Sequence, residues 1–203
     1  MSTTMAATPS EHPSSSYTVI IQTPPPAALI APQGFPTTPL PPSAPKPFLD
    51  AMRVRLAVFC DEQHCSADAE LDEDDPRSWQ WIVYDMDEPV ACIRLCPSPH
   101  ALHPNGYVDP DEEPYLKLQR FATLASHRGK GLGRMLVDTS LKWAAGHKQE
   151  IGGTDWKGMV LVHAQVSVES VWAKMGFVTD EKLGRWDEDG IEHLGMWRRI
   201  ELR

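Results

Sequence analysis

The chain has 203 residues, of which 41% are hydrophobic and 23% charged, with a net charge of −9. This size and composition suit one compact domain of ordinary size with some additional chain. The sequence has no run of eighteen apolar residues, which argues against a membrane span. Its first residues lack a basic region before an apolar stretch, so we expect no secretory signal. We therefore expect a cytoplasmic protein, and leave the nucleus open as a further location.

The four cysteines are Cys60, Cys65, Cys92 and Cys96. Four and three residues separate the members of the two pairs, and no Cys-x-x-Cys motif is present. In a chain without other signs of secretion, this pattern predicts reduced thiols and no metal site.

The predicted elements follow one another at ordinary spacing. Residues 1–16 are rich in Ser, Thr, Pro and Ala and are predicted to be disordered. Residues 17–203 are predicted to form one domain, with a proline-rich insertion at 24–47. The expected elements are a strand at 17–23, a helix at 48–59, a hairpin of strands 79–84 and 90–95, a strand at 115–124, a helix at 136–145, a strand at 159–164, a helix at 166–175, and a terminal hairpin from 177 with its last strand at 193–202. This order predicts an α/β fold with a mixed sheet and helices on both faces.

An acidic segment at 61–88 follows the first long helix, and Arg77 is its single Lys or Arg. It can be a solvated loop, or a patch that attracts a cationic substrate such as an amine. The second interpretation favours a small cationic partner over nucleic acid.

A glycine-rich loop between strand 115–124 and the helix after it is the most informative motif. It reads Arg128-Gly129-Lys130-Gly131-Leu132-Gly133. Its glycines allow tight turns and close approach of a ligand to the backbone, and the following helix directs unpaired amides and its positive dipole end into the loop. From Pro114 to Val137 the chain has no acid but has five basic residues, which are Lys117, Arg120, Arg128, Lys130 and Arg134. These features predict an anion site, most simply for phosphate.

The glycine spacing does not match the Gly-x4-Gly-Lys-Ser/Thr pattern of a P-loop, and a Rossmann loop would lie close to the N-terminus and be followed by an acid that 143–145 does not supply. The Arg-x-x-Gly-x-Gly pattern instead resembles the pyrophosphate loop of the GNAT superfamily of acyl-CoA N-acyltransferases. Further blocks resemble its ElaA-like subgroup. They are 54–63 with Glu70 and Asp72, 161–165, and 189–193 with Met196. The resemblance covers about residues 48–200.

The resemblance implies a mostly antiparallel, twisted sheet that splays at a central parallel pair, with acetyl-CoA bound in the gap. It implies that the backbone of the Phe121-Ala122-Thr123 segment pairs with the pantetheine arm. It assigns the pyrophosphate to Arg128, Gly129, Lys130, Gly131, Leu132, Gly133 and Arg134. It places Gln165 and Lys174 beside the cofactor, and the superfamily leaves a homodimer open.

The sequence departs from the family at the groups that move protons. The tyrosine that often protonates the departing thiolate is replaced by Trp172, whose indole is no useful acid. The carboxylate that some relatives use as base falls near Lys117. His163, on the predicted buried strand, is our candidate base because its ordinary pKa suits the task. A core histidine, ordered water, Glu169 and His193 remain alternatives.

These features predict an acetyl-CoA-dependent N-acetyltransferase that acts by direct transfer. The expected acceptor is a primary amine, with polyamines, amino sugars and aralkylamines as small cationic candidates. A protein lysine or N-terminus is an alternative acceptor. Two other classes of function also remain. One is a non-catalytic acetyl-CoA-binding module, and the other is a scaffold that recruits a partner through the proline-rich region.

Overall fold

A computed structural model describes residues 17–31 and 42–203, so the disorder predicted for 1–16 and part of the proline-rich insertion lie outside it. The strands are β1 Tyr17–Gln22, β2 Trp79–Asp85, β3 Glu88–Cys96, β4 Tyr115–Thr123, β5 Met159–Gln165, β6 Val178–Thr179, β7 Arg185–Glu188 and β8 Ile191–Arg199. The helices include α1 Ala27–Ile30, α2 Lys46–Arg55, the π-helix η1 Leu56–Glu62, α3 Leu132–Gly146, α4 Lys148–Ile151 and α5 Glu169–Ala173. Short 3₁₀ turns are η2 Ala67–Ala69, η3 Asp75–Arg77, η4 Ala125–His127 and η5 Val166–Val168.

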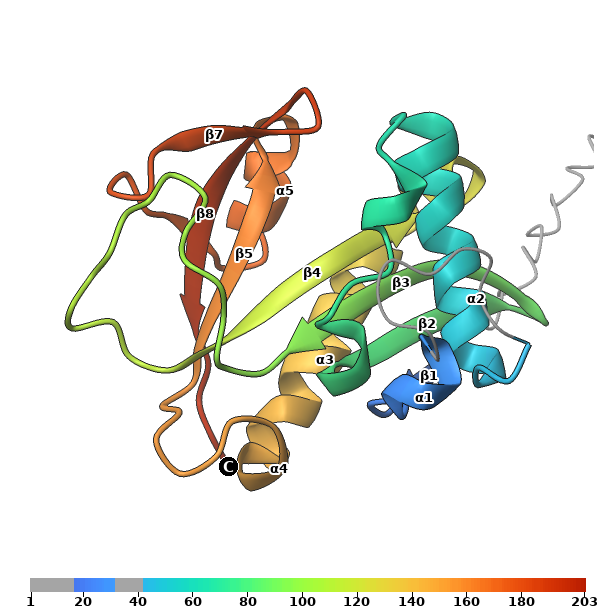
Figure 1. Cartoon of the computed structure of the whole chain (residues 1–203), viewed down its shortest axis with the longest axis horizontal. Helices are drawn as coiled ribbons and strands as arrows, with labels where there is room; N and C mark the ends of the chain where they lie inside the picture. Colours follow the sequence, from blue (N-terminus) through green and yellow to red (C-terminus); the bar gives the residue numbers. More distant parts are fainter. Residues whose placement is uncertain (1–16, 32–41) are drawn as a thin grey trace, which may run out of the picture.

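The strands form one sheet in the order β1-β2-β3-β4-β5-β8-β6, with β7 paired to β8. All of its strand pairs are antiparallel except β4 with β5. That parallel pairing runs only from Tyr115–Met159 to Leu118–Val162. Beyond it the two strands diverge, which leaves an opening in the middle of the sheet (Figure 1). The predicted mixed sheet with a splayed central parallel pair is therefore confirmed.

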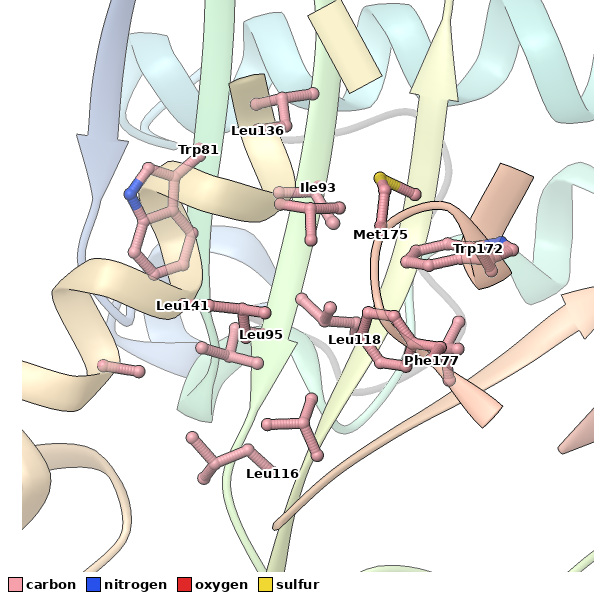
Figure 2. Packing of buried hydrophobic residues seen from close by; sticks show 14 of the residues in the cluster. Trp81, Ile93, Leu95, Leu116, Leu118, Leu136, Leu141, Trp172, Met175 and Phe177 are labelled. Atoms are coloured by element: carbon pink, nitrogen blue, oxygen red, sulfur yellow. The ribbon is translucent and has the colours of Figure 1, made fainter. Parts of the chain in front are cut away.

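Helices cover both faces of the sheet, because successive side chains of each strand point to opposite sides. On one face, Trp81 and Ile93 pack with Leu136 and Leu141 of α3 in the main hydrophobic core. Figure 2 shows part of this core, including Trp172, Met175 and Phe177 beside Leu118. On the other face, a second cluster joins α2 and η1 to the alternate strand residues, and consists of Ala51, Val54, Val58, Ile82, Tyr84, Cys92 and Ala122.

A buried ionic network attaches the acidic segment to the sheet. Arg55 is fully buried and donates hydrogen bonds to Glu70 and Asp75, at 2.6 and 2.7 Å. Arg94 donates two hydrogen bonds to Asp72, at 2.6 and 2.8 Å. Three acids of the segment, Glu70, Asp72 and Asp75, are thus compensated by buried arginines. For the remaining acids, the interpretation as an attractor for a cationic substrate stays a prediction.

Several predicted elements have other bounds in the structure: the helix expected at 136–145 is Leu132–Gly146, the one expected at 166–175 is a 3₁₀ turn followed by Glu169–Ala173, and the last strand expected at 193–202 is Ile191–Arg199. The helix expected at 48–59 begins two residues earlier and becomes a π-helix at Leu56, with its axis carried on to Glu62. The proline at the second position of α2 suits a helix start, because the first turn has no use for that N–H. The expected terminal hairpin is formed by β7 and β8, and the two-residue strand β6 adds a third pairing.

The four cysteines are all free, with Cys92 and Cys96 buried. Within 17–31 and 42–203, no group of three or more His, Cys, Asp or Glu side chains could hold a metal ion. In the same residues, no helix has the length and apolar character needed to cross a membrane.

Candidate active site

The opening between β4 and β5 continues into a cavity of about 840 Å³. Its walls come from η1, β4, the loop after β4, the start of α3, β5, α5, β7 and β8. Of the predicted site residues, Lys130 alone is not among those that line it. The ones that do are Phe121, Ala122, Thr123, Arg128, Gly129, Gly131, Leu132, Gly133, Arg134, His163, Gln165 and Lys174. Their role in binding stays a prediction.

The glycine loop takes a shape that other residues would disturb. Gly131 has φ of 81° and forms the N-cap of α3, a conformation that costs an L-residue about 1–2 kcal/mol. At Gly133 a Cβ atom would lie 2.6 Å from Cζ of Phe121. The loop therefore brings backbone amides and the start of α3 directly to the cavity, as an anion site requires.

The basic residues of the loop have different partners. Arg128 donates two hydrogen bonds to the carboxylate of Glu62, each of 2.7 Å, and one of 3.0 Å to the Thr123 carbonyl. Arg134 donates to the Lys174 carbonyl at 2.6 Å. Arg128 is thus already paired with an acid, while Arg134 and Lys174 stand together at the start of α3.

A bulge in β4 lies at the point where the sheet opens. Ala122 pairs with Cys92 and Gln119 with Arg94, so Arg120 and Phe121 both stand opposite Ile93. The Leu124 N–H donates to Val90 of β3 at 2.9 Å. Because backbone direction alternates along a strand, Thr123 and Phe121 direct their N–H groups away from β3 and into the opening. These are the groups expected to pair with an extended ligand.

One side-chain contact crosses the opening. Gln165 Nε2 donates to Gln63 Oε1 at 3.0 Å, joining the end of β5 to the residue after η1. This hydrogen bond and the Arg128–Glu62 ion pair hold the end of η1 over the cavity.

Residues 47–156 match the model of the Acetyltransferase (GNAT) family. The chain belongs to this family. It is 32% identical over 150 residues to the uncharacterized N-acetyltransferase YjcF of Bacillus subtilis, which covers 73% of this chain and 90% of the relative. It is 27% identical over 152 residues to the protein ElaA of Escherichia coli, which covers 73% and 85%.

Solved structures share the fold. The crystal structure of Escherichia coli ElaA aligns with a TM-score of 0.60 at 20% identity, over 90% of this chain and 100% of the other. An acyl-CoA N-acyltransferase from Pseudomonas aeruginosa aligns with a TM-score of 0.61 at 21% identity, over 90% and 99%. The GNAT fold implies an acyl-CoA co-substrate, and the open sheet, the glycine loop and the unpaired β4 amides fit one.

Trp172, where many GNAT proteins have a tyrosine, is buried and lines the cavity. Its ring packs on Phe121 and Phe177, with centroids at 5.0 and 5.1 Å. Its indole N–H makes no hydrogen bond to another residue of the described parts of the chain. Trp172 thus supports the wall that carries the bulge, and its indole cannot supply a proton.

His163 lies on the wall of the cavity that faces away from α3. Its Nδ1 is 3.7 Å from Glu188 Oε1, its ring stands edge-on to Trp186, and its buried Nε2 has no hydrogen-bond partner in the described residues. Burial lowers the pKa of His163 from 6.5 to about 4, against the opposite effect of Glu188. The ring is therefore neutral near pH 7 and is a weak base.

The same cavity is also lined by residues that were not predicted to bind the cofactor, among them Gln63, Lys117 and Glu188. Glu188 comes from the turn region before β8, and local sequence gives no sign that it meets β5. Of the other base candidates, His193 lines the cavity. Glu169 instead accepts a hydrogen bond from Thr179.

Proposed function

We propose that this GNAT protein is an N-acetyltransferase that transfers the acetyl group of acetyl-CoA to a small primary amine, in the cytoplasm. The observation that carries the proposal is the continuity of the cavity, which joins the glycine loop at the start of α3 to Lys117, His163 and Glu188 on the other side of the open sheet. A cofactor held along β4 can thus meet an acceptor that enters from the opposite side.

Acetyl-CoA supplies an acetyl group activated as a thioester. The residues of the chain then have three tasks. The start of α3 and the loop amides, with Arg134 and Lys174 beside them, hold phosphate charge. The N–H groups of Phe121 and Thr123 pair with the extended arm and are suited to stabilise the negative charge that develops on the carbonyl oxygen. The ring of Trp172 packs against the ring of Phe121 and holds it in position.

The site has no strong base, so solvent takes part in the proton transfers of the reaction. A primary ammonium has a pKa near 10 and must lose one proton before its nitrogen forms the C–N bond and the C–S bond breaks. His163 is neutral but weakly basic, so we propose that solvent takes this proton, with His163 and Glu188 orienting the amine. As the C–S bond breaks, the nitrogen loses a second proton to solvent, and because Trp172 is no acid the departing thiolate takes one proton from water.

The test is release of the CoA thiol from acetyl-CoA with a panel of polyamines, amino sugars, aralkylamines and amino acids. Cys60 and Cys65 are partly exposed, so a protein blank corrects the thiol signal. Gly131→Asp tests the loop, because a carboxylate there repels phosphate while Asp tolerates a positive φ. Gly131→Asn is its uncharged match. We expect acetyl-CoA binding by calorimetry to be lost in the first variant and kept in the second.

Trp172 makes a non-catalytic acetyl-CoA-binding module the second candidate. Wild-type protein that binds acetyl-CoA but releases no thiol with any amine of the panel would favour it. Equal affinity of both Gly131 variants for acetyl-CoA would instead overturn the assignment of the loop.

A further inference from the structure

The acceptor side of the cavity has its own cluster of charged side chains. Lys117 stands in register with Leu161, so it shares with His163 the face of the sheet that points away from α3. The adjacent strand residues Leu118 and Val162 point to the opposite face of the sheet and belong to the core that packs against α3. β7 brings Glu188 to the same wall, 3.7 Å from His163.

Lys117 is a largely buried cation without a direct partner. It makes no hydrogen bond and no ion pair within 4 Å with any residue in the described parts of the chain. Burial lowers its pKa, and the more distant charges of Glu188 and Asp74 oppose this effect. Lys117 is partly exposed at the cavity wall, so its ammonium loses some hydration without gaining a partner among the described residues and can be neutralised by an anionic group of a ligand.

The other basic side chains near Lys117 are already compensated. Arg120 donates to Asp72 at 2.9 Å and its Nε lies 3.1 Å from Glu70. Arg94 is paired with Asp72. Within 17–31 and 42–203, Lys117 is therefore the lysine or arginine on this wall that remains available to a ligand.

Glu188 is the matching anion. The Trp186 Nε1–H donates to it at 2.6 Å. Burial would raise the pKa of Glu188, but the contacts from His163 and Trp186 prevail and lower it to about 2. His163 beside it is neutral near pH 7. The Glu188 side chain is 45% exposed and carries a negative charge, and among the described residues its ion-pair contact is with His163, which is neutral near pH 7.

We propose that the acceptor carries a carboxylate as well as its amine, as an amino acid does, with Lys117 binding the carboxylate and Glu188 the ammonium before it loses its proton. This inference rests on the proposed transferase function and narrows its substrate class. The same arrangement selects against polyamines, because a second ammonium would meet Lys117 without an anion between them.

The experiment compares acceptors that share a carbon skeleton and differ in the carboxylate, at a pH where the fraction of free amine is calculated for each. Leucine, phenylalanine and 4-aminobutyrate are each paired with the corresponding amide, and kcat/KM is measured by thiol release with acetyl-CoA. We expect the acids to exceed the amides by about tenfold or more, since a charged hydrogen bond contributes roughly that much. Lys117→Met should remove this preference by lowering kcat/KM for the acids while changing that for the amides less than about threefold.

Lys142→Met, an exposed lysine of α3, is the matched control and should leave every ratio unchanged. Binding of each acid and amide to the CoA-saturated protein, measured by ligand-observed NMR, gives a readout that does not need turnover. Loss of acid binding in Lys117→Met without turnover in any variant would support the site and reject the transferase. Amides that react and bind as well as acids in wild-type protein would overturn the inference while the transferase stands.

Discussion

Arg128 of the glycine loop and Glu62 at the end of η1 join through two hydrogen bonds of 2.7 Å each. The side chains are 45% and 42% exposed, so this pair contributes at most about 1 kcal/mol to folding. The pair matters for binding, because Glu62 already holds the arginine that the family motif assigns to phosphate. Binding of an anion in the loop therefore competes with Glu62.

Replacement of Glu62 by Gln should strengthen acetyl-CoA binding by about twofold to fivefold, the range that an exposed ion pair can contribute. Calorimetric titration with acetyl-CoA measures the change. Glu150→Gln, an exposed acid on α4, provides the control and should leave the affinity unchanged. Weaker binding in Glu62→Gln would instead mean that the pair holds Arg128 in its binding position.

Gly133→Ala should lower acetyl-CoA affinity by at least about fivefold, because the new methyl group would stand 2.6 Å from Cζ of Phe121 and force that ring into the cavity. The same change adds helix propensity to α3, so stability should shift by no more than about 1 kcal/mol. Gly146→Ala, with open space at its Cβ, is the matched control. Unchanged affinity in Gly133→Ala would show that Phe121 does not border the cofactor.

Trp172→Tyr should raise kcat by about tenfold or more, since a positioned general acid contributes a factor of about 10² to 10⁴ and an indole provides none. Trp172→Phe keeps an aromatic ring against Phe121 and Phe177 but has no hydroxyl, and controls for packing. Steady-state thiol release across pH measures both variants. An equal change in the two would assign the effect to packing and leave protonation to water.

Arg55→Met should destabilise the fold by about 3 kcal/mol, because it removes the buried cation that Glu70 and Asp75 share and leaves them only Arg120 and Arg94 as charged partners. Burial opposes the charge of Arg55, but Asp75 and Glu70 prevail and raise its pKa above the ordinary value. Arg53→Met is the matched control, since its pair with Glu88 is 67% exposed on both sides and should change stability by less than about 0.5 kcal/mol. Urea unfolding compares them, and equal losses would contradict the network.

Acid should destabilise the protein through two histidines. Burial lowers the pKa of His100 and of His163 from 6.5 to about 4. Unfolded chains bind these protons below pH 6.5 while the folded state does not, so the contribution is full above pH 6.5 and is lost as pH falls toward 4. The free energy of unfolding should fall by about 3 kcal/mol for each histidine over this window. His100→Gln and His163→Gln should each reduce the slope by one proton; an unchanged slope would contradict the burial.

Much of the glycine-loop side of the cavity could be predicted as structure, because its features are local in sequence, while its role in cofactor binding stays a prediction. The strand before Gly129, the glycines and the α3 pattern lie within one continuous stretch, and each has its own physical signature. The start of the helix was placed too late, because α3 begins at Leu132, four residues before the expected 136, with the positive-φ Gly131 as its N-cap.

The acceptor half could not be predicted, because its residues meet through the sheet. Lys117 and Glu188 are seventy-one residues apart, and the order β4-β5-β8 with β7 beside it brings them to one wall. The acidic segment was open to misinterpretation for the same reason. Arg55 reads as one charged residue in a helix, yet it is fully buried and consumes two of those acids. Local composition reveals neither the proximity of Lys117 and Glu188 nor the ion pairs of Arg55.

Because the paired region of β4 and β5 is short, the sheet consists of two halves that are weakly joined to each other. Only four residue pairs join strands β1 to β4 with strands β5 to β8, and the remaining length of the junction has no backbone ladder. A ligand bound between β4 and β5 would connect the two halves of the sheet. Its departure leaves two interior strand edges facing each other across the cavity. Hydrogen exchange at Thr123 and Gln165 would therefore report occupancy directly, as amides at the seam gain protection when it is filled and lose it when it is empty.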